Sequence, residues 1–138
     1  MGRTIKLKKY EDIINEEEAA SAITPGALIE LTSAGTVQNH STADGAAATI
    51  LAVEDELQGG TIEDAYAEGD KVRAWYVQPG EEALVLVDAA FDPDVGAYLQ
   101  SDGAGKLKAH DTGEAIFQVI GDKQIDDSDN HRVPVRRV

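Results

Sequence analysis

The sequence predicts a mainly β fold, a small barrel or sandwich of short antiparallel strands with an extended N-terminal arm and one short helix. Short apolar runs recur along the 138 residues, and glycine-rich or proline-containing turns separate them. This spacing is typical of small barrels and sandwiches. Aromatic residues make up only 5% of the chain, so we expect a core of alanine, valine, isoleucine and leucine. The length suits one domain.

Residues 1–24 are expected to form the arm, and residues 25–138 the barrel-like body. Polar and apolar residues alternate over Thr4–Lys8, which indicates a short strand or an extended segment. The stretch Glu11–Ala22 has only two large apolar residues. It could form a weakly amphipathic helix, and we interpret it as an arm or linker. Thr24-Pro25-Gly26 then marks a turn.

The body begins with short predicted strands. Leu28–Leu31 is apolar, and the turn Thr32–Gly35 leads into a return strand over Thr36–Gln38. Thr49–Val53 is a further apolar run. Residues 61–67 are the one short helix that we expect, with Thr61 as its N-cap.

A hairpin is predicted next. Lys71–Val77 and Glu82–Val87 flank the turn Gln78–Glu81, whose central Pro-Gly pair is typical of a type II turn. Residues 83–87 are apolar on both faces, so this strand should run through the middle of the core.

Four further strands complete the predicted body: Tyr98–Ser101, Lys106–Lys108, Ile116–Ile120 and Arg132–Val138. The last contains Pro134. Because proline cannot donate a backbone hydrogen bond, we expect this segment to be an edge strand.

Part of the sequence recurs after 70 residues. The matching positions are Gly26-Ala27 with Gly96-Ala97, Ala34-Gly35 with Ala104-Gly105, and His40 with His110. After a small gap, residues 50–53 match residues 116–119. The pattern fits an old duplication or merely two similar hairpins, since small residues at turns match easily.

Charge is divided between the ends and the middle of the chain. The net charge is −14, and all 26 acidic residues lie between Glu11 and Asp129. Seven of the 12 cationic residues lie outside that range, which leaves 26 acidic residues against five basic ones in the middle. Such a middle repels nucleic acid and anionic membranes, and no window approaches the roughly 20 apolar residues of a membrane span. The acid excess fits a protein of a very salty cytoplasm or an ordinary acidic surface.

We find no catalytic constellation, and we expect no enzyme, metal or cofactor. The absence of cysteine excludes disulfides and thiolate ligands. No serine lies in a nucleophile elbow, and Gly103–Lys106 lacks the spacing of a phosphate loop. His40 and His110 could form a paired metal or pH-sensitive site, or be solvent-facing residues at strand ends. Asp126–Asn130 could ligate Ca²⁺, but it lacks the features of an EF-hand loop and fits an acidic surface loop.

Trp75 is the only tryptophan. On the predicted strand it shares a face with Lys71 and Arg73. If the opposite face packs on the core, Trp75 points outward beside two cations, a composition common in interface hot spots. If the barrel is covered on both faces, Trp75 is buried.

Several stretches carry a resemblance to a known family. The chain contains ITPGALIEL, ILAVED, GDKVRAWYVQPGEEALVLV, VGAYLQSDGAGKL and AIFQVIGD, and VPV follows in its last strand. With the basic N-terminal segment, these stretches are similar to the small head decoration, or capsid cement, proteins of tailed viruses. The family's motifs match at Pro25-Gly26, Gly69–Val72, Gly96–Leu107 and Gly113–Gly121. The acidic stretch Asp122–His131 departs from the pattern.

The resemblance implies a structural role. Such proteins bind an assembled capsid, commonly as trimers, and brace neighbouring subunits without a cofactor. It implies the major capsid protein as partner, a homotrimer, and a place on the capsid exterior after synthesis in the host cytoplasm. With the acid excess, it suggests a virus of a halophilic archaeon. The partner-binding residues that we expect are Arg3, Lys6, Lys8, Lys9, Tyr10, Lys71, Arg73, Trp75, Arg136 and Arg137.

Other roles stay open at this point. A viral tail or baseplate subunit, or a β-barrel adaptor, would have the same composition. A Ca²⁺-binding domain or an enzyme using the aspartate-rich loop is a further alternative.

Overall fold

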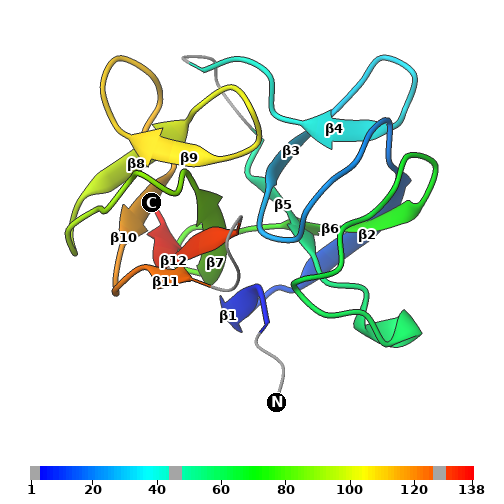
Figure 1. Ribbon diagram of the computed structural model, residues 1–138, viewed down its shortest axis with the longest axis horizontal. Coiled ribbons are helices and arrows are strands. Elements are labelled where there is room, and N and C mark those ends of the chain that lie inside the picture. The colour runs from blue at the N-terminus through cyan, green and yellow to red at the C-terminus, as the bar shows by residue number, and fades with distance from the viewer. Residues whose placement is uncertain (1–3, 44–47, 126–129) are drawn as a thin grey trace.

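The computed structural model describes residues 4–43, 48–125 and 130–138, and this part of the chain is mainly β. Its strands form two sheets that lie side by side along the long axis (Figure 1). One of them contains a closed five-stranded barrel. The predicted fold class, a small β-barrel or sandwich, is therefore confirmed.

The first sheet forms what we call the N-terminal unit. Its strands are β2 (Ile13–Glu18), β3 (Leu28–Leu31), β4 (Val37–Asn39), β5 (Ile50–Val53) and β6 (Lys71–Tyr76). They pair in the order β2-β6-β5-β3-β4. The two edges meet where Ala19, just after β2, bridges Val37 of β4 in parallel, so the sheet curls back on itself.

The second sheet forms the C-terminal unit. Its barrel strands are β7 (Glu82–Val87), β8 (Tyr98–Ser101), β9 (Leu107–Ala109), β10 (Phe117–Val119) and β12 (His131–Arg137). They pair in the order β7-β9-β8-β10-β12, and β12 pairs with β7 to close the barrel. Two short strands extend the sheet: β1 (Lys6–Lys8) pairs with β7, and β11 (Gln124–Ile125) pairs with β12.

The two units share one topology and one register. The pair Ile29–Asn39 in β3 and β4 corresponds to Leu99–Ala109 in β8 and β9, 70 residues on. Around each unit, the other pairs correspond in the same way: Leu51–Trp75 with Gln118–Arg136, and the parallel bridge Ala19–Val37 with Val87–Leu107. The 70-residue repeat thus extends from one hairpin to all five strands, which favours duplication.

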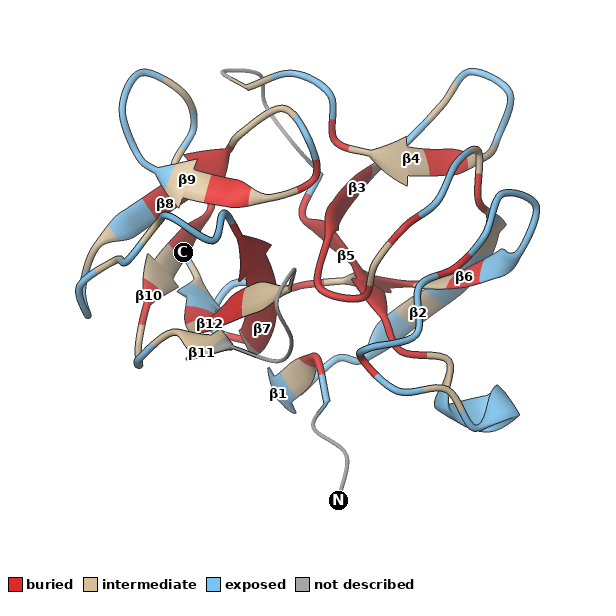
Figure 2. Ribbon diagram, viewed as in Figure 1, coloured by how far each residue is buried: buried red, intermediate tan, exposed pale blue. Residues whose placement is uncertain are grey.

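Buried residues run through both units (Figure 2), and each unit contributes side chains to a buried cluster of the other. The larger buried cluster contains Ile5, Leu28 and Trp75 together with Val85 and Phe117 of the C-terminal unit. The smaller cluster fills the N-terminal unit but includes Leu86 of β7. The units therefore form one body with a shared apolar interior.

The N-terminal arm is shorter than predicted. Ile13–Glu18 pairs with β6 along its whole length, and both Ala19 and Ile23 are buried. Even Ile5 is fully buried in the shared core. The sequence signal was weak because β2 buries few of its side chains, and its place in the sheet depends on backbone pairing.

The predicted helix over residues 61–67 is wrong. Thr61 donates its backbone N–H and its hydroxyl to the carboxylate of Asp64 (2.8 and 3.1 Å), which forms a tight turn. Tyr66 then pairs with Ile23 in an antiparallel bridge. Among the described residues the helical segment is instead the single 3₁₀ turn η1 (Glu56–Gln58).

The predicted hairpin over residues 71–87 is also wrong, although its strands and its turn are present. The turn closes with Glu81 N–H donating to the carbonyl of Gln78 (3.0 Å). However, β6 pairs with β2 and β5, whereas β7 pairs with β1, β9 and β12. Type II turns splay the flanking strands relative to a tight hairpin, and here the turn links the two units. The strand 83–87 is buried on both faces, as predicted.

The last strand, β12, is not an edge strand. It pairs with β7 along residues 131–136, while its other side meets β10 through residues 135–137 and β11 through residues 131–132. Pro134 lies in the gap between β10 and β11. Its missing N–H is therefore not needed there, and its carbonyl accepts from Ile120 (3.0 Å).

Candidate functional site: the junction between the two units

The tip of the β8–β9 hairpin is inserted into the N-terminal unit. The carbonyl of Gly105 accepts from the N–H of Leu28 (2.8 Å), and its N–H donates to the carbonyl of His40 (3.2 Å). Gly105 thus bridges the splayed end of β3 and β4. Its φ is +83°, and a Cβ there would meet Asn39 at 2.7 Å. This approach requires glycine.

A buried arginine holds the junction from the other side. Arg132 is fully buried, and its Nη2 donates to the carbonyls of Pro25 (2.9 Å) and Ile62 (2.7 Å). Nearby, the N–H of Leu86 donates to the carbonyl of Gly26 (3.0 Å). Arg132 is one of the seven cationic residues near the ends of the sequence, but its planar guanidinium binds carbonyls inside the molecule.

A serine, a histidine and a glutamate also meet at the junction. His40 Nδ1 lies 2.7 Å from Ser101 Oγ, and His40 Nε2 lies 3.7 Å from Glu30 Oε1. Burial alone raises the pKa of Glu30, but hydrogen bonds from Ser41 and Gln38 and the nearby His40 outweigh it, so the net pKa is lowered. Ser101 and His40 are only 1% and 3% exposed. Both side chains therefore lie inside the junction, where their contact joins the two units.

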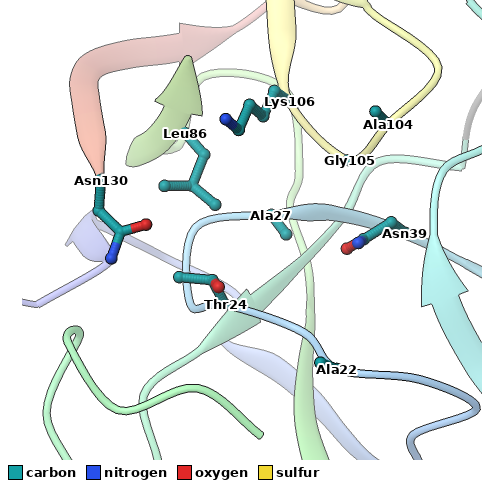
Figure 3. Close-up of a pocket in the computed structure, with 9 residues that line it drawn as sticks. All are labelled: Ala22, Thr24, Ala27, Asn39, Leu86, Ala104, Gly105, Lys106 and Asn130. Atoms are coloured by element: carbon teal, nitrogen blue, oxygen red, sulfur yellow. The ribbon is translucent and has the colours of Figure 1, made fainter. Parts of the chain in front are cut away.

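A pocket of about 260 Å³ lies at the same junction (Figure 3). Leu86 lies near the polar ends of Thr24, Lys106 and Asn130, and Asn39 lies across the pocket, on the other side of Ala27. The Oδ1 atom of Asn39 is buried and has no hydrogen-bond partner within the described part of the chain. One cation and three neutral polar groups can hold water or a small anion, but they include no activated nucleophile.

Six of the ten predicted partner-binding residues gather around the turn Gln78–Glu81, which joins the two units and which we call the linker. We call Lys6, Lys8, Lys9, Tyr10, Arg136 and Arg137 the basic surface. Lys8 and Arg136 are both in register with Glu82. The hydroxyl of Tyr10 donates to the carbonyl of Pro79, and Arg137 Nη1 donates to the carbonyl of Val77 (2.8 Å).

Part of this positive charge is neutralised locally. Lys6 and Lys9 contact Asp12 (2.9 and 2.7 Å), and hydrogen bonds first from Lys9 and then from Lys6 lower the pKa of Asp12. Arg136 contacts Glu82 (3.0 Å). Lys8 is exposed and makes no ion pair with any residue in the described ranges.

The other four predicted residues are not brought to this surface. Lys71 is at the start of β6, about five residues of strand away from the linker, or roughly 16 Å. Arg73 contacts Glu56 (3.5 Å). Trp75 is fully buried in the shared core, so the outward-facing interpretation is wrong. Arg3 lies outside the described residues.

Glu81 is the residue that sequence analysis missed at this surface. It is fully buried, and its carboxylate accepts from the backbone N–H groups of Tyr10 (2.7 Å), Glu11 (3.0 Å) and Gln78 (2.7 Å). Burial raises its pKa, but these N–H groups outweigh burial and lower it overall. Glu81 therefore fastens the basic N-terminal segment to the linker. In the sequence it is one acid among 26, with no distinguishing signal.

The two matched histidines do not form a paired site. His40 contacts Ser101 and Glu30, whereas His110 is exposed and its Nε2 contacts the carbonyl of Gly113 (2.9 Å). Across the described residues, no group of three His, Asp or Glu side chains could hold a metal ion. Residues 126–129 of the aspartate-rich loop lie outside those residues. No helix in the described part is long and apolar enough to cross a membrane.

No protein-family model matches the chain, and no curated protein matches it.

Proposed function

We propose that this chain is a structural virion protein that binds the outside of an assembled capsid and stabilises it. The observation that supports the proposal is the basic surface, which unites cations from both ends of the chain on an otherwise acidic molecule. The sequence resemblance to head decoration proteins supplies the partner, the major capsid protein, and the homotrimeric state. A virus of a halophilic archaeon is the host context that fits the acid excess.

The charge distribution suits docking in one orientation. A positive patch on a molecule of net charge −14 is attracted to an acidic surface, while the remaining surface is repelled. Such complementarity contributes to orientation and association rate. Glu81 and Arg137 fix the backbone beneath the patch, which reduces the entropy lost on binding.

Reversal of exposed charges tests the proposal better than truncation. Removal of residues 1–10 would also remove Ile5 from the shared core and disturb the fold. We would instead change Lys8→Glu and Lys9→Glu together, because both side chains are exposed. Binding to assembled shells of the major capsid protein from the same genome would be measured by co-sedimentation. We expect binding to be weaker by about tenfold, or about 1.4 kcal/mol.

Lys108→Glu is the matched control, since it reverses a charge on β9, outside the basic surface. It should leave the sedimented fraction unchanged. Equal binding by the double variant and the unchanged protein would contradict the role of the basic surface. If the unchanged protein does not sediment with shells, or its genome encodes no capsid protein, a tail subunit or an adaptor becomes the better explanation.

A further inference from the structure

The contact between the two units uses a different face of each. The N-terminal unit contributes what we call its slot face, formed by Pro25, Gly26, Leu28 and His40. The C-terminal unit contributes its tip face, formed by Leu86, Ser101, Gly105 and Arg132. A contact of this kind between equivalent units is heterologous, so it leaves one face of each type unused.

The unused faces are found by applying the shared register. The second slot face lies on the C-terminal unit and consists of Val95, Gly96, Tyr98 and His110. The second tip face lies on the N-terminal unit and consists of Glu18, Leu31, Gly35 and Lys71. In Figure 1 the strands β4 and β9 point the same way, and the turn between β3 and β4 lies at the opposite end of the molecule from the start of β8.

Both unused faces expose apolar side chains. Val95 and Tyr98 are 63% and 49% exposed on the slot face, and Leu31 is 52% exposed on the tip face. A Cβ added at Gly35 would have nothing within 4 Å, whereas one at its counterpart Gly105 would meet Asn39 at 2.7 Å. Equivalent structural elements are thus covered at the junction between the units and exposed at the two ends of the molecule.

The polar groups of the internal contact also have counterparts. His40 N–H donates to the carbonyl of Leu28 (2.9 Å), and His110 N–H donates in the same way to Tyr98 (2.9 Å). The end of the β8–β9 pair at Tyr98 and His110 can therefore receive the glycine tip of a second copy. Arg132 donates to the Pro25 carbonyl. Lys71 occupies the position in β6 that Arg132 occupies in β12, so in a contact between copies it would be the cation that faces the carbonyl of Val95 in the next copy.

We propose that copies of this chain associate head to tail, with the tip face of one copy on the slot face of the next. The partner is a second copy, because each face repeats a contact already made within the chain. Heterologous contacts close into a ring when the rotation between copies allows it and otherwise extend into an open filament, and a ring of three would contain six equivalent units. The inference deepens the proposed function, since a closed ring of three is the arrangement that would give the homotrimer.

Charge makes this contact weaker than the internal one. β2 has Glu16 and Glu18 at the positions where β7 has the buried Leu84 and Leu86. Each copy also carries a net charge of −14. Salt screens such repulsion, with a Debye length of about 30 Å at 0.01 M and about 3 Å at 1 M. We therefore expect association to increase with salt concentration.

Sedimentation velocity of the full chain at about 0.01 M and about 1 M NaCl tests the inference. At high salt the weight-average mass should rise by about twofold to threefold. Tyr98→Asp damages only the slot face, and Leu31→Asp damages only the tip face. Each variant alone should stay monomeric, while an equimolar mixture should form dimers and nothing larger. Leu7→Asp, on β1, is the control and should associate normally.

Trp75 is buried, so its fluorescence verifies that each variant is folded. A wild-type chain that stays monomeric at high salt would overturn the inference, as would a mixture that does not associate. Loss of association in Leu7→Asp would also overturn it. The capsid proposal is judged separately by co-sedimentation, so either proposal can fail while the other stands.

Discussion

At the scale of single residues, Glu81 is a buried charged side chain that joins two segments of the backbone. Its buried carboxylate accepts three backbone N–H groups from two segments. We expect Glu81→Gln to lower the free energy of unfolding by about 1–3 kcal/mol, because one amide NH₂ would then face backbone donors. Urea unfolding at neutral pH measures the loss. Glu82→Gln is the matched control, since its partly exposed pair with Arg136 contributes about 1 kcal/mol or less.

The pH dependence of the Glu81 contribution has a definite sign. The folded pKa is below the ordinary value, which is about 4.3 for an unfolded glutamate. The carboxylate therefore stabilises the fold above that pH, and the stabilisation is lost as pH falls through the folded pKa. The difference between wild type and Glu81→Gln should be largest near neutral pH and shrink below about pH 4. A constant difference across this range would contradict the assignment.

The residues that sequence analysis missed share a physical cause. Glu81 and Arg132 bind backbone groups that come close only after the two units have packed. Nothing in the local sequence distinguishes them from surface charges. Trp75 had two interpretations because the alternation of residues along a strand indicates which side chains share a face. It does not indicate whether that face is covered. The gathering of Lys6–Tyr10 with Arg136 and Arg137 depended on the same packing.

At the scale of elements, apolar runs located strands such as Leu28–Leu31 and Glu82–Val87 well. Pairing was predicted less well, because it depends on contacts distant in sequence. The turn at Gln78–Glu81 is local and was correct, yet the strands on either side of it join different sheets. β2 was missed because its six residues bury little. In the sequence, the repeat was visible in its two glycine hairpins and in residues 50–53 and 116–119. The second match was one residue out of register, because Ile50 corresponds to Phe117 in the pairing.

The two equivalent hairpin tips give a matched pair of variants. Gly35 and Gly105 have the same φ, +84° and +83°, so alanine carries the same left-handed cost of roughly 1–2 kcal/mol at each. At Gly105 the new Cβ would also meet Asn39, which adds about 1–3 kcal/mol of overpacking. We expect Gly105→Ala to be clearly the more destabilising in urea unfolding at low salt. Equal losses of unfolding free energy would show that the tip at Gly105 does not contribute to the stability of the junction.

At the scale of the whole molecule, the shared interior decides how the chain unfolds. Trp75 of the N-terminal unit belongs to the same buried cluster as Phe117 and Val133 of the C-terminal unit, and Leu86 of β7 belongs to the other cluster. Separation of the units would also break the hydrogen bonds from Arg132 to the carbonyls of Pro25 and Ile62. Neither unit therefore has a complete core alone.

We expect one cooperative transition despite the two-unit architecture. Trp75 fluorescence reports on the junction and far-UV circular dichroism on both sheets, so their urea midpoints should coincide, as two-state unfolding requires. For the same reason, residues 78–138 expressed alone should not fold, because Leu86 and Arg132 would lose their partners in the N-terminal unit. Two separated transitions, or a folded fragment, would mean that each unit is stable by itself. The repeat would then be a pair of independent domains, and the internal contact would be a weaker precedent for contacts between copies.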